Sequence, residues 1–526
     1  MNADCASVWS VALVGLDGRM VEVEAAIGGG LPRTVLVGLP DTALYQARDR
    51  CRAAYSASRL TWPQHLLTIN LSPATLPKAG SHYDLAIAAA VSIAAHGAPG
   101  DRMAGTVVLG ELGLDGRVRA VRGLLPALLA AARSGFGRAV VPKDQLDEAR
   151  LVEGLTLVPV GSLQQLLAWL RREPIPDDLP EDPPGGGGAP DSRPPAVPAT
   201  AQVKDLIDVV GQPEAKWALE VAAAGRHHLF FHGPPGVGKT MLAERIPGLL
   251  PELTVPEALE VAAIRSLAGF TLDGELDRRP PYSDPHHSAS VASVIGGGPR
   301  MAKPGAISCA HRGVLFMDEA PEFPARVLES LRTPLELGMV TLGRSEVQAR
   351  YPARFQLVMA ANPCPCGNAA TRGATCTCAP MSVRRYADRI SGPIRDRVDI
   401  QQTLVPVKSA YLRAAMEGRE NTAAVAARVS EARGRQRARL TGTGWHTNGE
   451  VSGTYLRNQL PLPFGLAVVE DAVSMGRISP RGVDKILRLA WTVADLAGVE
   501  RPSADHVQIA LGMRRGGATG GWGSAS

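Results

Sequence analysis

The sequence predicts an α/β protein with an N-terminal α/β or α+β domain, a central domain built on a parallel sheet, and a C-terminal helical domain. Short apolar or alternating runs are interleaved with helical patterns up to residue 402, which is typical of α/β folds. A segment rich in proline and glycine at residues 171–200 divides this region in two. Beyond residue 405 only helical patterns follow, and they end at residue 515.

Length and composition agree with a globular protein of several domains. The chain has 526 residues, which is room for about three domains. Hydrophobic residues make up 45% and charged residues 20%, which excludes wholesale disorder, a coiled-coil rod and a collagen-like repeat. The longest apolar stretch, Leu85–Ala95, is too short to span a bilayer, and the N-terminus lacks a secretion signal. We therefore expect a cytoplasmic protein, and the odd number of cysteines, seven, fits a reducing compartment.

The first predicted domain covers residues 1–170. Its apolar runs predict strands at Ser10–Leu13, Thr34–Val37, Leu66–Asn70, Thr106–Leu109 and Ala139–Val141. Helical periodicity predicts helices at Asp41–Tyr55 and Leu124–Arg133. Residues 171–200 contain nine prolines and four glycines, so they cannot bury enough apolar surface to fold, and we expect a flexible linker. The Gly/Ser-rich residues 516–526 are expected to form a flexible tail.

A phosphate-binding loop is predicted at the start of the central domain. Residues 228–240, HLFFHGPPGVGKT, read as a short strand, a glycine-rich loop and the start of a helix. This is the P-loop pattern in its required context, with Lys239 placed to reach the β and γ phosphates and Thr240 to ligate magnesium. The nucleotide-binding residues are therefore Gly233, Pro234, Pro235, Gly236, Val237, Gly238, Lys239 and Thr240.

Two further predicted strands end in polar side chains. The apolar run 313–317 ends at Asp318 and Glu319, and strands of an α/β sheet present such side chains in the ligand crevice. We expect Asp318 to hold magnesium and Glu319 to act as general base on the attacking water. The run Phe355–Ala360 is followed by Asn362, which we expect to position that water or to sense the γ phosphate. A structural role for Asn362, at the turn before a proline, stays open.

Four of the seven cysteines lie close together in the sequence. Cys364, Cys366, Cys376 and Cys378 offer enough thiolates for one tetrahedral zinc ion. The one-residue spacing within each pair is unusual for such a site, and Pro365 and Gly367 would have to bend the chain. Structural zinc and unliganded thiols both remain open from the sequence.

Longer motifs identify a family. The chain resembles the magnesium-chelatase-like AAA+ ATPases of the YifB/ComM type over essentially its whole length, through PHHSAS (285–290), LRTPLELGMVTLGR (331–344), AANPCPCG (360–367), SGPIRDRVDI (391–400) and SPRGVDKILRLAWTVADLAG (479–498). The resemblance implies a Lon-protease-like, ChlI-type domain at 1–170, the linker at 171–200, an AAA+ ATPase domain at 201–405, a helical lid at 406–515 and the tail at 516–526. It also implies ATP and Mg²⁺ as ligands.

The resemblance assigns two arginines. Arg397 is similar to the arginine finger that reaches a neighbouring subunit's nucleotide, with Arg395 as a competitor for that role. Arg481 is similar to the second sensor, which closes on the γ phosphate. Both arginines have surface ion pairing as the alternative. Because a finger used between subunits needs a ring, the resemblance implies a homo-oligomer, most simply a hexamer.

In such rings, inserted hairpins face the central pore. Residues 296–305 and 339–350 read as two such hairpins, with Arg300 and Lys303 at one tip and Arg344 at the other. A ring of basic tips would attract a phosphate backbone, so we expect single-stranded or branched DNA as the partner. The alternative is that these are solvated loops with incidental charge.

The N-terminal domain resembles the proteolytic domain of Lon proteases through residues 70–130. The alignment places His82, or Ser81 in a shifted register, at the nucleophile position and Leu125 at the position of the essential lysine. Without that base the serine is not activated, so we expect a domain without proteolytic activity.

The leading hypothesis is an ATP-driven motor on DNA, such as a ComM-like branch-migration helicase in recombination during natural transformation. The alternative is an ATPase of magnesium-chelatase type that acts on a metal/tetrapyrrole or protein substrate. The adjacent His286 and His287 do not by themselves favour a metal site, because paired histidines in a loop usually have a structural role.

Overall fold

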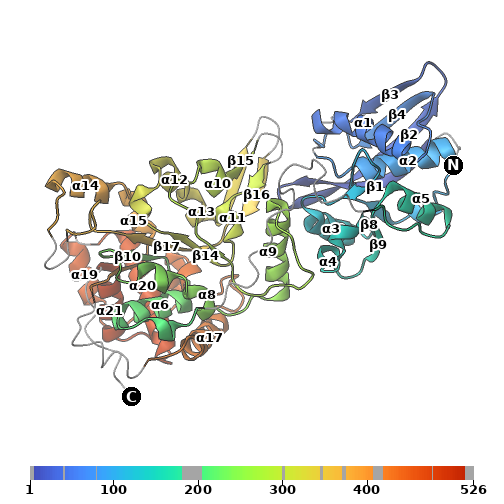
Figure 1. The fold of residues 1–526 in the computed structure, drawn as a ribbon. Helices are drawn as coiled ribbons and strands as arrows, with labels where there is room; N and C mark the ends of the chain where they lie inside the picture. The colour runs from blue at the N-terminus through green and yellow to red at the C-terminus, as the bar shows by residue number, and fades with distance from the viewer. Residues whose placement is uncertain are drawn as a thin grey trace.

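The computed structural model describes residues 5–38, 42–78, 80–180, 204–298, 302–343, 348–369, 375–406, 419–476 and 478–515. The N-terminal domain lies on one side of the molecule, and the central and C-terminal domains form a larger body on the other (Figure 1). Within the described residues, no helix is long and apolar enough to cross a membrane.

The N-terminal domain is built on a mixed sheet of seven strands in the order β3-β4-β2-β1-β5-β8-β9. Strands β4, β2 and β1 pair antiparallel, and the remaining neighbours pair parallel. The strands are β1 (Cys5–Val14), β2 (Asp17–Gly28), β3 (Arg33–Val37), β4 (Leu66–Ser72), β5 (Thr106–Val108), β8 (Arg138–Pro142) and β9 (Thr156–Val160). The five predicted strands are confirmed, and β2 and β9 are additional.

Helices cover both faces of this sheet because side chains alternate along a strand. On β1, Val8 and Ala12 pack in a cluster with the buried helix α2, whereas Val11 and Leu13 pack in a cluster with α3. The helices are α1 (Thr42–Ala57), α2 (Asp84–His96), α3 (Leu124–Arg133), α4 (Leu146–Ala149) and α5 (Leu163–Arg171). The apolar stretch at Leu85–Ala95 is therefore a core helix.

The start of the predicted linker packs on this domain. Gln165 of α5 donates hydrogen bonds to Pro176 O (3.0 Å) and Asp178 Oδ1 (3.1 Å), and Lys143 pairs with Asp178. Polar contacts thus hold residues that composition alone assigns to a flexible segment. Residues 181–203, which include the rest of the predicted linker at 181–200, and the predicted tail lie outside the described residues.

The central domain contains a parallel sheet of five strands in the order β11-β14-β17-β10-β18. The strands are β10 (Leu229–His232), β11 (Tyr282–Ser283), β14 (Val314–Met317), β17 (Gln356–Ala361) and β18 (Ile400–Thr403). Met317 pairs with Met359, and His232 pairs with Ala361, so β10, β14 and β17 end at nearly the same level. This register brings together the polar residues that follow each strand.

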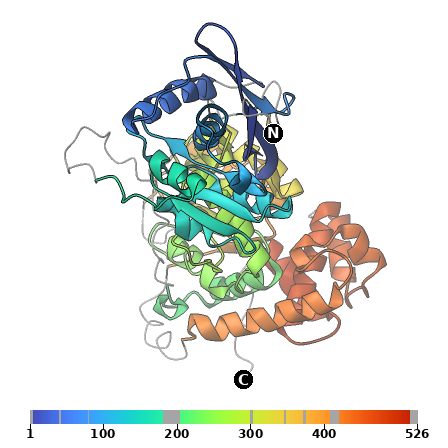
Figure 2. The same ribbon diagram turned by 90° about the vertical axis from the view of Figure 1, so that its right-hand side faces the viewer.

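Helices α6 (Pro213–Gly225), α7 (Lys239–Ala243) and α8 (Ile246–Leu249) pack on this sheet, and the C-terminal domain continues the same core. Phe231 and Val358 of the sheet belong to one apolar cluster with Ile486 and Leu489 of the C-terminal domain. Figure 2 shows the long helix α17 and the other C-terminal helices gathered on one side of the molecule. They are α17 (Thr422–Arg439), α18 (Gly453–Asn458), α19 (Ala467–Ser474), α20 (Pro480–Leu496) and α21 (Ala504–Arg515).

Helix α9 (Val255–Ala268), an insertion of the central domain, connects it to the N-terminal domain (Figure 1). Its Ala262 and Ala263 pack in the same cluster as Leu124 and Leu128 of α3. The buried Ser266 hydroxyl donates to Glu148 Oε1 at 2.6 Å. The two domains therefore share a continuous apolar and hydrogen-bonded contact.

Candidate functional site

The P-loop turns around the side chain of Lys239. Gly236 (φ +76°) and Gly238 (φ +95°) adopt left-handed conformations that favour glycine. The Lys239 ammonium donates to Gly233 O at 2.7 Å, Pro234 O at 2.8 Å and Asn362 Oδ1 at 2.9 Å. The lysine thus spans the loop and the end of β17, where the sequence predicts a phosphate site.

Burial lowers the pKa of Lys239, while the nearby carboxylates of Asp318 and Glu319 act in the opposite direction. Its partners are two carbonyls and an amide oxygen, none of which carries a full negative charge. A polyphosphate would replace these weak acceptors with charged oxygens, which form stronger hydrogen bonds with an ammonium.

Thr240 and Asp318 meet at the start of α7. The Thr240 hydroxyl donates to Asp318 Oδ2 at 2.7 Å. Hydroxyl and carboxylate oxygens are the donors that Mg²⁺ prefers, and a site built from few protein ligands leaves room for phosphate oxygens and water. The residues present therefore fit a magnesium ion, and Thr240 and Asp318 would hold it.

Glu319 follows in a strained backbone conformation. Its φ of +49° lies in the left-handed region, which costs a non-glycine residue about 1 kcal/mol or more. The Glu319 N–H donates to Asp318 Oδ1 at 2.9 Å, which holds the turn. The carboxylate is 48% exposed, so water can reach it.

His287 contacts this carboxylate. Its Nδ1 lies 3.4 Å from Glu319 Oε2, whereas the adjacent His286 Nδ1 interacts with the Ser288 hydroxyl at 2.7 Å. Sequence reasoning assigned both histidines a structural role. The two histidines differ only in their contacts in the folded chain, which the sequence does not show. The one sequence signal that could have pointed to His287 is the PHHSAS string at 285–290.

Asn362 lies beside Lys239 and lines a cavity of about 230 Å³. The cavity is also lined by His232 from the end of β10, Tyr386 from α14 (Pro380–Asp388) and Arg395 from α15 (Gly392–Arg397). The structure thus brings together Lys239, Thr240, Asp318, Glu319 and Asn362.

The two finger candidates have different surroundings. Arg397 forms an ion pair with Glu336 of α13 (Arg332–Leu337) and donates to Pro393 O at 2.7 Å, and its side chain is 14% exposed. Arg395 lines the cavity beside Asn362 and donates to Ala387 O. Within the single chain, Arg397 is therefore an ion-pair partner, and its reach toward a neighbouring subunit stays a prediction.

Arg481 lies in the first turn of α20, after the N-cap Ser479. Its side chain is exposed and forms no hydrogen bond or ion pair with the parts of the chain that the structure describes. Ile478 and Val483 flank it and pack against the same apolar cluster as Val237 of the P-loop. Arg481 is therefore an exposed cation without a partner among the described residues, on a helix that shares an apolar cluster with Val237.

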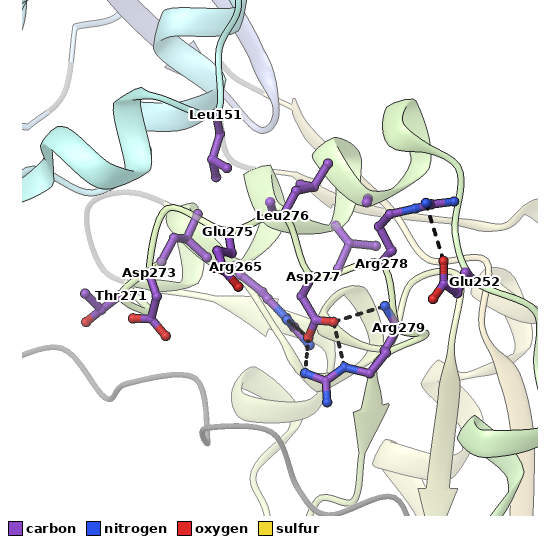
Figure 3. Close-up of a pocket in the computed structure, with 14 residues that line it drawn as sticks. Leu151, Glu252, Arg265, Thr271, Asp273, Glu275, Leu276, Asp277, Arg278 and Arg279 are labelled. Atoms are coloured by element: carbon purple, nitrogen blue, oxygen red, sulfur yellow. Dashed lines mark hydrogen bonds and ion pairs between the residues drawn. The ribbon is translucent and has the colours of Figure 1, made fainter.

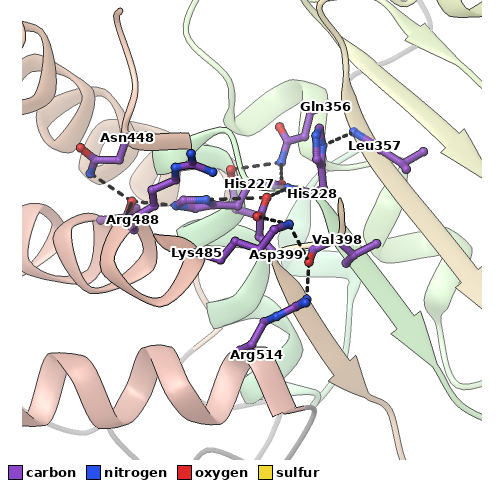
Figure 4. Close-up of polar contacts among 12 residues, drawn as sticks. His227, His228, Gln356, Leu357, Val398, Asp399, Asn448, Lys485, Arg488 and Arg514 are labelled. Carbon is purple, nitrogen blue, oxygen red and sulfur yellow. Dashed lines mark hydrogen bonds and ion pairs between the residues drawn. The ribbon is translucent and has the colours of Figure 1, made fainter. Parts of the chain in front are cut away.

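A buried polar network connects the segment after Arg397 to helix α20 of the C-terminal domain (Figure 4). Asp399 accepts from Lys485 Nζ of α20 at 2.9 Å and from the backbone N–H of His228 at 2.8 Å. Its charged neighbours, with Lys485 first, hold the pKa of Asp399 well below its usual range against the effect of burial. Burial lowers the pKa of His227 and His228 to about 4 each, so both rings are neutral.

The two predicted hairpins are confirmed, and they lie side by side. Strands β12 (Gly296–Gly297) and β13 (Lys303–Pro304) pair antiparallel, as do β15 (Met339–Gly343) and β16 (Gln348–Pro352). Tyr351 of β16 donates from its hydroxyl to Ala302 O. Lys303 is exposed, whereas Arg300 and Arg344 lie outside the described residues.

The four clustered cysteines come together in space. Their sulfur atoms all lie within 4.8 Å of one another, an arrangement that fits a metal ion. Cys364 is buried and the other three are half-buried.

In the N-terminal domain, the residues aligned with protease positions make structural contacts. His82 is buried, with Nε2 2.8 Å from Val11 O, and burial lowers its pKa to about 4. Ser81 donates to Glu111, and Leu125 is an apolar core residue of α3.

A second cavity, of about 620 Å³, lies where α9 meets the N-terminal domain (Figure 3). Leu151 comes from the N-terminal domain, and the other lining residues belong to 252–279. Three of its arginines are paired with carboxylates: Asp277 accepts from Arg279 Nε at 2.9 Å and lies 3.8 Å from Arg265, and Arg278 lies 3.4 Å from Glu252. This cavity is separate from the P-loop, none of whose residues line it.

Family models of magnesium-chelatase subunit ChlI match three different parts of the chain. Residues 205–412 match the model of magnesium chelatase, subunit ChlI; residues 23–145 match subunit ChlI of Mg-chelatase; and residues 419–514 match the ChlI C-terminal model. The chain is 50% identical to an uncharacterized protein of Mycobacterium tuberculosis over 97% of this chain and 98% of the relative. It is 38% identical to the uncharacterized protein YifB of Escherichia coli over 96% of each chain. It is 36% identical to the competence protein ComM of Haemophilus influenzae over 97% of each chain.

Proposed function

Because the chain belongs to the magnesium-chelatase ChlI-like family of YifB and ComM, we propose that it is an ATP-driven hexameric motor that acts on DNA. In its specific form, the proposal is a branch-migration helicase in recombination during natural transformation. The chain itself is a magnesium-chelatase-like ATPase. The observation that carries the proposal is the site around Lys239 in a chain that matches a competence protein along nearly its full length.

The chemistry of this site is hydrolysis of a nucleoside triphosphate. Lys239 would bind the terminal phosphates, and Asn362 would hold the lysine or the attacking water in place. Glu319 would take the proton of that water as it attacks the γ phosphorus, while the bond from the γ phosphorus to the β–γ bridging oxygen breaks and the nucleoside diphosphate leaves. Thr240 and Asp318 would hold a magnesium ion, which would supply positive charge against the charge on the phosphate oxygens.

A ring supplies the groups that one chain lacks at this site. In the ring, Arg397 would exchange Glu336 for the neighbouring subunit's phosphate, and Arg481 would close from the lid. The adjacent hairpins would present Lys303, Arg300 and Arg344 to a phosphate backbone. In this proposal the Lon-protease-like N-terminal domain serves in assembly or substrate binding, through its contact with α9.

The test is ATP turnover without DNA, with single strands and with forked or four-way duplexes, using Glu319→Gln as the control. Strong stimulation by branched DNA that is absent in the control would support the motor. Turnover that depends on Glu319 but ignores every DNA would overturn the DNA assignment. It would favour the second candidate, an ATPase of chelatase type acting on a metal/tetrapyrrole or protein substrate, which the family model's description supports.

A further inference from the structure

Four thiols converge directly after Asn362, at the end of β17. The sulfur of Cys364 lies 3.3 Å from that of Cys366 and 3.8 Å from that of Cys376, and the last two are 3.6 Å apart. Cys378 completes the group, in which all four sulfur atoms lie within 4.8 Å of one another. A tetrahedral ion with metal–sulfur bonds of about 2.3 Å places its ligands about 3.8 Å apart. The sulfur atoms therefore have the spacing of a closed four-thiolate site, and they are too far apart for a disulfide of about 2.05 Å.

The backbone supports this arrangement. The Ala369 N–H donates to Cys364 Sγ at 3.3 Å, a bond that would stabilise a thiolate there. The Gly367 N–H donates to Cys364 O at 2.9 Å and closes a tight turn in which Gly367 has a φ of +81°. This turn lets two cysteines separated by one residue face the same point. Residues 370–374, between the two pairs, lie outside the described residues.

The same turn packs against the nucleotide loop. A Cβ on the buried Gly367 would lie 2.6 Å from both Cγ and Cδ of Pro235, so the cysteine turn and the P-loop are in direct contact. Asn362, two residues before Cys364, accepts from Lys239. On the other side, Cys378 lies two residues before α14, which leads to α15 and Arg397. The cluster thus joins three elements of the nucleotide site.

We propose that these four cysteines hold a structural zinc ion that fixes the P-loop and Asn362, so that nucleotide affinity depends on the bound metal. Thiolates select zinc over magnesium and calcium, which prefer oxygen ligands. Four protein ligands leave no open coordination position, which makes the ion structural rather than catalytic. The dependence of nucleotide affinity rests on the proposed function, because it requires that the P-loop bind ATP.

The test combines elemental analysis of the full-length protein with titration of a fluorescent ATP analogue. We expect about one zinc per chain, loss of zinc in Cys366→Ser, and retention in the control Cys5→Ser, whose exposed thiol lies in β1. The dissociation constant for the analogue should rise by about tenfold in Cys366→Ser, a typical size for coupled sites. Less than about 0.2 zinc per chain, iron in place of zinc, or cysteine pairs oxidised to disulfides would overturn the site.

Gly367→Ala tests the contact between the cysteine turn and the P-loop without removing a metal ligand. The added methyl group would displace Pro235, and at a φ of +81° it also strains the cysteine turn, so the zinc content of this variant is measured beside its affinity. Gly367→Ala protein that still holds about one zinc per chain should bind the analogue more weakly. Unchanged affinity in Gly367→Ala would overturn the coupling. If circular dichroism shows that Cys366→Ser does not fold, the wild-type protein is compared before and after a chelator removes its zinc, and again after zinc is added back. An affinity for the analogue that stays the same through both steps would also overturn the coupling. A wild-type protein that holds zinc but binds no nucleotide would instead refute the proposed function.

Discussion

Lys485→Met is expected to destabilise the central and C-terminal domains strongly, because it removes one partner of a buried ion pair. Lys485 Nζ donates to Asp399 Oδ1 at 2.9 Å and to Val398 O at 3.1 Å. Lys485 is 9% exposed and Asp399 is 6% exposed. Methionine keeps the apolar part of the side chain but removes the ammonium group. The buried Asp399 carboxylate then keeps only the hydrogen bond from the His228 N–H, out of the two described above. Breaking a buried pair in this way costs about 3–5 kcal/mol.

Urea unfolding followed by tryptophan fluorescence, to which the buried Trp491 on α20 contributes, measures this cost. With a slope of about 3 kcal/mol per molar urea, the midpoint should fall by about 1 M or more. The matched control is Lys143→Met, which breaks the pair of Lys143 with Asp178 on the surface, where both side chains are about half exposed. That change should cost about 1 kcal/mol or less.

The double variant Lys485→Met/Asp399→Asn removes both charges. It should be less destabilised than the sum of the two single variants, because no uncompensated charge remains buried. A Lys485→Met protein that unfolds at the midpoint of the Lys143→Met control, or a double variant whose loss equals the sum of the singles, would refute the reasoning.

Four other predictions address catalysis, DNA binding and acid stability. Arg397→Ala should lose ATP turnover by about 10³-fold while its nucleotide affinity is retained, and turnover near the wild-type rate would refute the finger role. His287→Ala should lower kcat by about tenfold with KM for ATP unchanged, which is well short of the 10²–10⁴-fold loss expected when a general base is removed. His287→Gln should recover part of this loss. Equal kcat in the wild type, His287→Ala and His287→Gln would show that the contact with Glu319 has no effect on turnover. Lys303→Ala with Arg344→Ala should reduce the salt dependence of DNA binding by about one unit of slope for each lost phosphate contact, whereas an unchanged slope and affinity would remove the hairpins from the DNA site. Burial lowers the pKa of His82 in the folded protein to about 4, below its ordinary value of about 6.5. Between these pH values the unfolded chain binds more protons, so the free energy of unfolding decreases as the pH falls from about 6.5 to about 4, by up to about 3 kcal/mol. A His82→Gln protein whose urea unfolding has the same pH dependence as the wild type would contradict this.

Local patterns predicted which residues come together around the P-loop, because a phosphate site requires adjacent residues. The P-loop needs glycine at fixed offsets from Lys239, and Asp318 and Asn362 follow directly after buried strands. Their proximity then follows from a parallel sheet whose strands end at one level. Strand β2 was missed, although its sequence VEVEA alternates as a half-buried strand should.

Contacts between distant residues were not predictable in the same way. Asp399 and Lys485 are 86 positions apart, and Ser266 and Glu148 are 118 apart. A lone lysine in an amphipathic helix gives no sign that it is buried, because lysine is usually exposed. Similarly, α9 has the composition of an ordinary helix, and its contact with the N-terminal domain appears only when both surfaces are present.

The network around Asp399 also bears on how a ring motor of this kind would work. Arg514 of α21 pairs with Asp396 at 3.3 Å and donates to Val398 O, while Lys485 of α20 contacts Val398 and Asp399. The segment that carries Arg397 is therefore bound to both α20 and α21 by buried and partly buried polar contacts. A lid movement that began at Arg481, one turn before Lys485 on α20, would have to move the finger segment or break these contacts. Because the cost of breaking them is several kcal/mol, we expect the lid of one subunit and its finger toward the next to move together.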